Sequence, residues 1–111
     1  MAKIECEVRG DFYNILSDIE TSIERSVSAS REDSSFFSVG DTLCAVRVYE
    51  RYSYWGGNRV SLNLTLLKKG DRIMLSAITS GGSQAVFFKL NTVGEESFLN
   101  SISDTVEKYR V

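Results

Sequence analysis

The chain of 111 residues contains no histidine. It therefore lacks the Ser-His and Cys-His pairs of nucleophilic enzymes, imidazole ligands for metals and the usual proton carrier near neutral pH. Catalysis would have to use carboxylates, tyrosines, lysines or a thiol, and no spacing of these residues demands a catalytic site. We expect a non-enzymatic domain without a cofactor or metal, and the catalytic alternative is a site built from a carboxylate and a tyrosine.

The chain has few cysteines and no long apolar run. Its two cysteines, Cys6 and Cys44, lie far apart among apolar neighbours, so we expect small buried side chains rather than a disulfide or a reactive thiol. No apolar run approaches the roughly 18 residues that a membrane-spanning helix requires. The first residues resemble neither a secretory signal nor a transit peptide, so we expect a cytoplasmic chain without a membrane span.

The chain also lacks a basic excess, because its formal net charge is −2. A dedicated nucleic-acid binder draws most of its affinity from a basic surface that neutralises phosphates. Arg47, Arg51 and Arg59, placed on the polar face of a sheet near Tyr49 and Trp55, resemble the stacking platforms that bind single-stranded RNA. The acidic balance of the other residues weakens that field, so we do not expect nucleic acid as a partner.

The first thirty residues predict a strand followed by a helix. Apolar and charged residues alternate strictly from Ala2 to Arg9, which predicts a half-buried strand. Asp11 is a good N-cap for a helix that we expect to run to about Ala29. The apolar stripe of that helix consists of Phe12, Ile15, Leu16, Ile19, Ile23 and Val27.

Residues 30–35 are polar and show no period, so we expect a loop there. The segment from Phe36 to Val39 fits a short strand before a turn at Gly40 and Asp41, and the sequence leaves open whether this strand forms.

Residues 43–90 alternate between polar and apolar side chains and predict four antiparallel strands joined by three tight turns. If Gly56, Gly57 and Asn58 form the first turn, Tyr54 lies opposite Val60. The inner face then carries Cys44, Val46, Val48, Glu50, Tyr52, Tyr54, Val60, Leu62, Leu64 and Leu66. Turns at Gly70-Asp71 and Gly82-Ser83 add to this face Ile73, Leu75, Ala77, Thr79, Val86, Phe88 and Leu90.

The last twenty residues predict a second helix. Thr92 and Glu95 have the spacing of a capping box, which marks a helix start. The apolar stripe that follows consists of Phe98, Leu99, Ile102, Val106 and Tyr109. Together the elements predict one α+β domain over residues 1–111, a two-layer sandwich of a mainly antiparallel meander sheet packed by an N-terminal and a C-terminal helix, in the order β-α-(β)-β-β-β-β-α.

This order resembles a trimmed helix-grip fold, the fold of plant-allergen-like and START-like lipid carriers, in which a curved sheet wraps a long C-terminal helix. The segments 52–62 (YSYWGGNRVSL), 75–85 (LSAITSGGSQA) and 91–96 (NTVGEE) look like those of a family of short bacterial proteins of unassigned function. The second resemblance covers under half of the chain and implies no catalytic residues.

Two functions follow as expectations. In the first, a small apolar ligand binds in a groove between sheet and helix, where Glu50, Tyr52 and Tyr54 orient a polar atom, because a buried carboxylate must pair, protonate or face a wet cavity. The alternative is that a bulge near the strand end flips the register and leaves Glu50 in water.

In the second function, the outer face of the sheet forms a homodimer. Apolar residues that interrupt this otherwise polar face suggest an interface, and the predicted register pairs Ile78 with Phe87. The candidate interface residues are Tyr49, Trp55, Met74, Ile78 and Phe87. Coverage of this face by the first helix or by the Phe36-Phe37 segment is the competing interpretation.

Overall fold

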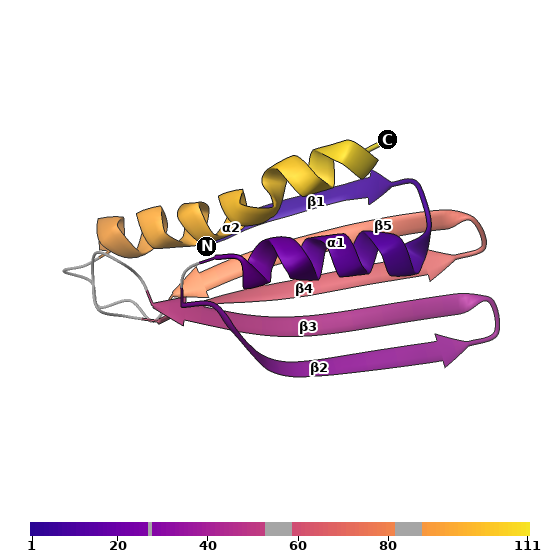
Figure 1. Ribbon diagram of the computed structural model, residues 1–111, viewed down its shortest axis with the longest axis horizontal. Helices are drawn as coiled ribbons and strands as arrows, with labels where there is room; N and C mark the ends of the chain where they lie inside the picture. Colours follow the sequence, from indigo (N-terminus) through magenta and orange to yellow (C-terminus); the bar gives the residue numbers. More distant parts are fainter. Residues whose placement is uncertain (27, 53–58, 82–87) are drawn as a thin grey trace.

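The computed structural model describes residues 1–26, 28–52, 59–81 and 88–111. Its elements, in chain order, are β1 (Ala2–Val8), α1 (Phe12–Glu24), β2 (Ser30–Val39), β3 (Thr42–Tyr52), β4 (Arg59–Lys69), β5 (Arg72–Gly81) and α2 (Phe88–Tyr109). The strands form one antiparallel sheet in the order β1-β5-β4-β3-β2 (Figure 1). The predicted α+β fold class, an antiparallel sheet packed by an N-terminal and a C-terminal helix, is confirmed.

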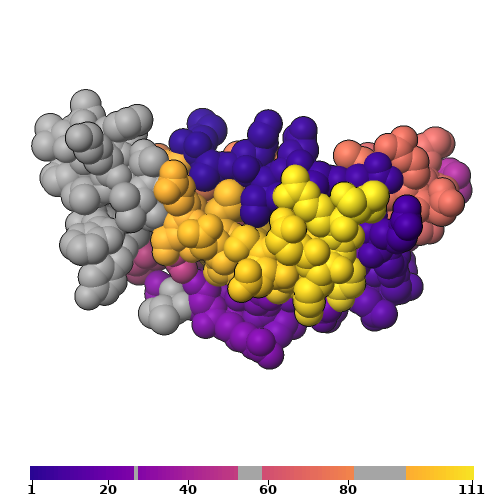
Figure 2. Space-filling view, turned by 90° about the horizontal axis from the view of Figure 1, so that it is seen from above, coloured from indigo at the N-terminus to yellow at the C-terminus, as the bar shows by residue number. Residues whose placement is uncertain are grey.

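Both helices lie on the same face of the sheet (Figure 1). Helix α2 contacts β5, β1 and β4, and α1 packs beside α2 above β4. Figure 2 shows α2, in orange to yellow, lying along the molecule with the indigo of β1 beside it. The C-terminal residues also close the free edge of β1, because the backbone N–H of Val111 donates to the carbonyl of Glu7 over 3.0 Å.

The predicted N-terminal elements are confirmed with small changes at the boundaries. The Asp11 carboxylate accepts a hydrogen bond from the backbone N–H of Asn14 over 3.0 Å and caps α1. The apolar stripe of α1 from Phe12 to Ile23 is buried, whereas the helix ends at Glu24 rather than at Ala29. In β4 and β5 the predicted inner residues, which are Val60, Leu62, Leu64, Leu66, Ile73, Leu75, Ala77 and Thr79, are all buried.

The expected loop over residues 30–35 is wrong, because these residues belong to β2. Strand β2 lies at the edge of the sheet, and all ten of its side chains are exposed. With both faces wet, the strand needs no apolar alternation, so its sequence lacks the period that predicts a strand. A bulge between Arg31 and Asp33 interrupts its pairing with β3.

The start of α2 is also earlier than predicted. Phe88 and Leu90, which we assigned to a strand, lie in this helix, and Thr92 lies inside it rather than at its cap. Val86 and the proposed turn at Gly82-Ser83 lie outside the described residues. Short apolar runs fit helix and strand equally well, which explains the wrong assignment. The predicted buried stripe from Phe98 to Val106 is confirmed.

The pairing of β3 with β4 differs from the predicted register by three residues. Tyr52 lies opposite Arg59, and Tyr49 lies opposite Leu62, whereas we expected Tyr52 opposite Leu62. Because side chains alternate between faces, an odd shift turns every residue of β3 to the other face. The predicted inner face of β3 is therefore its outer face.

Candidate functional site

Strand β3 turns two arginines toward the helices and several apolar residues toward solvent. The inner side of β3 carries Leu43, Ala45, Arg47, Tyr49 and Arg51. The outer side carries Cys44, Val46 and Val48, all of them partly exposed. A sheet with one wet face normally shows the opposite pattern, with polar residues on the solvent side.

The inner side of β3 holds a charged cluster beside α1. The Tyr49 hydroxyl donates to Glu20 Oε2 over 3.4 Å and to Glu24 Oε2 over 3.5 Å. Arg47 Nε lies 3.4 Å and Arg31 Nη1 lies 3.3 Å from the same oxygen of Glu20. Tyr49 itself is fully buried. Side chains of α1 and β2 thus meet the inner side of β3 around Tyr49.

This cluster matches the carboxylate-tyrosine alternative in composition but not in chemistry. Burial, followed by the charges of Glu20 and Glu24, raises the pKa of Tyr49 well above its ordinary value of 10.0. The phenol therefore stays protonated at neutral pH and acts as a hydrogen-bond donor rather than as a base or nucleophile. Its role is to satisfy the carboxylates that line α1.

The outer face of the sheet is ordered in rows, because the register aligns residues across all five strands. The central row consists of Ser35, Val46, Thr65, Ser76 and Glu5. The turn-side row, toward the β4–β5 turn, consists of Phe37, Cys44, Leu67, Met74 and Glu7. The far row, on the other side of the central row, consists of Asp33, Val48, Asn63, Ile78 and Lys3.

Large apolar side chains of the outer face are exposed. Phe37 is 59% exposed, Met74 is 39% exposed and Ile78 is 37% exposed. Phe37, Met74, Cys44 and Leu67 make a continuous apolar row, which Val46 and Val48 extend along β3, whereas Ser76 and Asn63 separate Ile78 from this patch. Patches of this kind mark interaction sites more often than bare surface.

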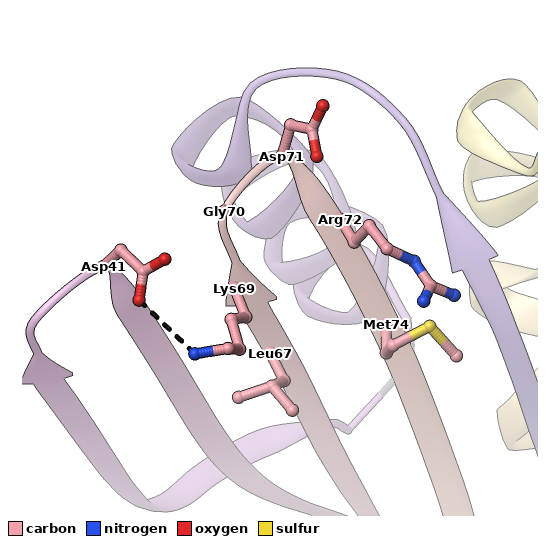
Figure 3. Close-up of a pocket in the computed structure, with 7 residues that line it drawn as sticks. All are labelled: Asp41, Leu67, Lys69, Gly70, Asp71, Arg72 and Met74. Carbon is pink, nitrogen blue, oxygen red and sulfur yellow. Dashed lines mark ion pairs between the residues drawn. The ribbon is translucent and has the colours of Figure 1, made fainter.

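The turn-side row borders an open hollow of about 620 Å³. Its lining residues are Asp41, Leu67, Lys69, Gly70, Asp71, Arg72 and Met74 (Figure 3). Lys69 Nζ lies 3.6 Å from Asp41 Oδ1, and Arg72 Nη2 lies 2.9 Å from Glu7 Oε1. Both cations of the hollow are thus paired, and Leu67 and Met74 add apolar surface to the patch beside it.

The predicted ligand-binding residues do not face the helices. Glu50 lies on the outer face, where Arg59 Nε lies 3.1 Å from its Oε1. Tyr52 lies on the same face and is 60% exposed, with the Arg59 guanidinium 5.5 Å from its ring centre. The inward placement of Glu50 and Tyr52 is therefore wrong, and Tyr54 lies outside the described residues.

Of the predicted interface residues, Met74 and Ile78 lie exposed on the outer face as expected. Tyr49 is buried on the inner face, so its predicted outward position is wrong. Trp55 and Phe87 lie outside the described residues, and Ile78 pairs with Asn63 and Lys3. The sequence prediction missed Cys44, Val46 and Val48 as outer residues, and their apolar character was the reason.

Arg47, Arg51 and Cys44 on β3 also face the side opposite to the expected one. Arg47 and Arg51 lie on the inner face, so the row of outward arginines beside aromatic rings is wrong for both. Cys6 faces inward beside Leu75 and Cys44 faces outward beside Leu67, so the free cysteines lie on opposite faces. Burial raises the pKa of the Cys6 thiol.

Two kinds of feature, a metal-binding group and a membrane-spanning helix, are absent from residues 1–26, 28–52, 59–81 and 88–111. No group of three or more Cys, Asp or Glu residues in these ranges is arranged to hold a metal ion. Neither α1 nor the described part of α2 combines the length and apolar character of a membrane-crossing helix.

Comparisons with known proteins give a family and no function. No curated protein and no solved structure matches the chain. The model of a family of unknown function (DUF6054) matches residues 1–110, and the chain therefore belongs to this family.

Proposed function

We propose that this chain is a self-associating interaction domain in which the outer sheet faces of two copies pack together. The observation that carries the proposal is the inverted pattern of β3, whose arginines face the helices while Cys44, Val46 and Val48 face outward. Apolar residues on a wet face cost solubility, and a partner that covers them removes that cost. Two antiparallel sheets pack face to face at about 10 Å in many proteins.

The outer face is self-complementary, which favours a second copy as the partner. A two-fold axis along the central row lays the turn-side row of one copy over the far row of the other. Met74 then meets Ile78 of the second copy, and Cys44 meets its Val48. The apolar residues of β3 and β5 thus find apolar counterparts under this symmetry.

The charges at the edge of the patch obey the same symmetry. On β1 the turn-side row ends in Glu7 and the far row ends in Lys3, so the two-fold axis brings each Lys3 toward the Glu7 of the other copy. The net charge of −2 per chain adds only weak repulsion between copies. The arrangement therefore matches apolar residues on β3 and β5 and opposite charges on β1, whereas it lays Phe37 over Asp33 and Leu67 over Asn63.

The ligand carrier remains the second hypothesis, with less support. Its support is the packing of the C-terminal helix α2 on the sheet, which is what the resemblance to helix-grip carriers implies. However, Leu62, Leu64, Leu66 and Phe98 are fully buried between sheet and helices, and Glu50 and Tyr52 lie on the other face. A carrier would have to hold its ligand at a place other than the one we predicted.

Analytical ultracentrifugation of the wild-type chain and Met74→Glu tests the proposal. We expect a dimer for the wild type and a dissociation constant at least about a hundredfold higher for Met74→Glu, because an unpaired charge becomes buried in the interface. Tyr13→Glu is the control, since Tyr13 is also a large exposed side chain, 56% exposed, but lies on α1. A wild-type chain that stays monomeric at concentrations on the order of 1 mM, or equal effects of the two variants, would refute the proposal.

A further inference from the structure

Arg51 occupies a place where three elements meet on the helix side of the sheet. It lies on the inner face of β3, opposite Val60 of β4, next to the end of the strand. Its guanidinium carbon lies 4.6 Å from the ring centre of Phe98 in α2. Its Nη1 donates to the hydroxyl of Ser26, just beyond α1, and its Nη2 donates to the hydroxyl of Ser97 over 2.8 Å.

Arg51 has no carboxylate partner among the described residues. None of the ion pairs formed by the described residues includes Arg51. The segments outside the description, residues 27, 53–58 and 82–87, contain neither aspartate nor glutamate. The neighbouring inner arginine, Arg47, differs in this respect, because it pairs with Glu20.

A half-buried guanidinium without an anion is costly, since burial removes water from the charge without replacing it. Consistent with this cost, burial lowers the pKa of Arg51 below its ordinary value. The ring of Phe98 and two hydroxyl oxygens compensate the charge only in part. The position therefore favours an anion that comes from outside the chain.

The hydrogen-bond directions around Arg51 also suit an anion. Both serine oxygens accept from the guanidinium, so each hydroxyl keeps its own proton to donate elsewhere. The guanidinium has five N–H donors, of which these two contacts occupy two. Donors from β3, from α2 and from the residues just beyond α1 thus converge, and none of the described contacts of Arg51 supplies a negatively charged acceptor.

We propose that Arg51, Ser26 and Ser97 form a binding site for an oxyanion, the carboxylate or phosphate group of a small molecule. The guanidinium supplies the charge and a planar pair of donors, and the hydroxyls supply two further hydrogen bonds. The site lies on the helix side of the sheet, so it is independent of the proposed self-association, which uses the outer face. Each proposal can fail without the other.

NMR titration with sodium phosphate and, separately, sodium acetate at constant ionic strength tests the site. We expect saturable shifts of the Arg51 side-chain Nε–H and of the backbone amides of Ser26 and Ser97. A response to acetate alone assigns the site to carboxylates, and a stronger response to phosphate assigns it to phosphate groups. Shifts that grow linearly without saturation for both anions would overturn the proposal.

Two variants separate specific binding from general attraction to positive charge. Arg51→Gln should weaken the binding of the better anion about ten- to a hundredfold, because it removes a charge-assisted pair of hydrogen bonds. Arg25→Gln removes one positive charge from an exposed position at the end of α1 and should leave the affinity unchanged. Equal affinities of Arg51→Gln and the wild type would refute the site.

Ser97→Ala keeps the cation and removes one hydroxyl. It should weaken binding about three- to tenfold, as expected for the loss of one hydrogen bond to a charged group. This variant decides the question if Arg51→Gln does not fold, since Ser97 lies exposed on α2. An unchanged affinity for Ser97→Ala would show that the hydroxyl is no part of the site.

Discussion

Tyr49 shows how one side chain connects the sheet to α1. Its ring is buried in the core and its hydroxyl reaches two glutamates of the helix, so it satisfies charges at the border of the apolar layer. The same position misled the sequence prediction, because an inward tyrosine between two inward arginines does not resemble a core strand.

Replacement of Tyr49 by phenylalanine should lower the free energy of unfolding by about 1 kcal/mol at pH 7, through the loss of hydrogen bonds to carboxylates. The pH dependence provides a sharper test. The folded-state pKa of Tyr49 is raised, so its contribution is complete below pH 10.0, the ordinary pKa, and is lost as the pH rises above it. Denaturant unfolding between pH 9 and 11 should show a slope shallower by up to about 1.4 kcal/mol per pH unit in Tyr49→Phe. Parallel slopes would contradict the assignment.

Gly10 illustrates a constraint of the backbone. It links β1 to α1 with φ at +144°, and an added Cβ would lie 3.4 Å from side-chain atoms of both Ile15 and Tyr109. Gly70, in the β4–β5 turn, has φ at +61° and open space around it. The two glycines therefore separate backbone strain from close packing.

Gly10→Ala should destabilise the fold by about 2 to 3 kcal/mol, whereas Gly70→Ala should cost about 1 kcal/mol. Chemical denaturation of both variants in one buffer measures the difference. If Gly70→Ala proved the more damaging change, the backbone conformation of Gly10 and its contacts with Ile15 and Tyr109 would not be the stronger constraint.

At the scale of elements, the success of sequence prediction follows burial. Strands β4 and β5 and both helical stripes were predicted because one side of each is buried and apolar, which produces a clear period. Strand β2 was missed because all of its side chains are exposed, and β3 was reversed because its more apolar side faces outward. The turn at Gly70-Asp71 was predicted correctly from its residue types, whereas the turn assumed at Gly56, Gly57 and Asn58 led to the wrong register of β3 with β4.

The candidate site was predictable only in part for the same reason. Met74 and Ile78 lie on β5, whose register with β4 was predicted correctly, and both face outward as we expected. Glu50 and Tyr52 lie on β3, whose predicted register with β4 was wrong by three residues. Both side chains therefore lie on the face opposite to the predicted one. Arg51 carries no sequence signal as a site, because its missing counter-ion depends on which residues fold next to it.

Charge reversal on β1 tests whether the partner of the outer face is a second copy of the chain. In the proposed dimer Lys3 of one chain lies near Glu7 of the other, so Lys3→Glu should weaken the dimer about three- to tenfold. Adding Glu7→Lys reverses both charges and should restore most of the affinity at low salt. Ultracentrifugation of the single and double variants measures this effect. A double variant weaker than either single variant would exclude the antiparallel arrangement of the two β1 strands.

At the scale of the whole molecule, one layer of helices leaves half of the sheet surface without cover. The helices bury the inner faces of β1, β5 and β4, and the charged cluster around Tyr49 covers the inner side of β3. The outer face keeps an apolar patch that the single chain does not need for its own core. In the proposed dimer, the monomer therefore folds by itself and association adds stability to that fold.

The proposed association through the outer face predicts that the stability of the fold depends on chain concentration. The wild-type unfolding temperature should rise with chain concentration once it exceeds the dissociation constant, because only folded chains present the outer face. Ile78→Glu should abolish this dependence and yet unfold within a few degrees of dilute wild type, since Ile78 already contacts water in the single chain. Differential scanning calorimetry over a hundredfold range of concentration makes the comparison. If the unfolding temperature of the wild type does not change over this range, the result contradicts the dimer. If Ile78→Glu is strongly destabilised when dilute, Ile78 belongs to the core rather than to an interface.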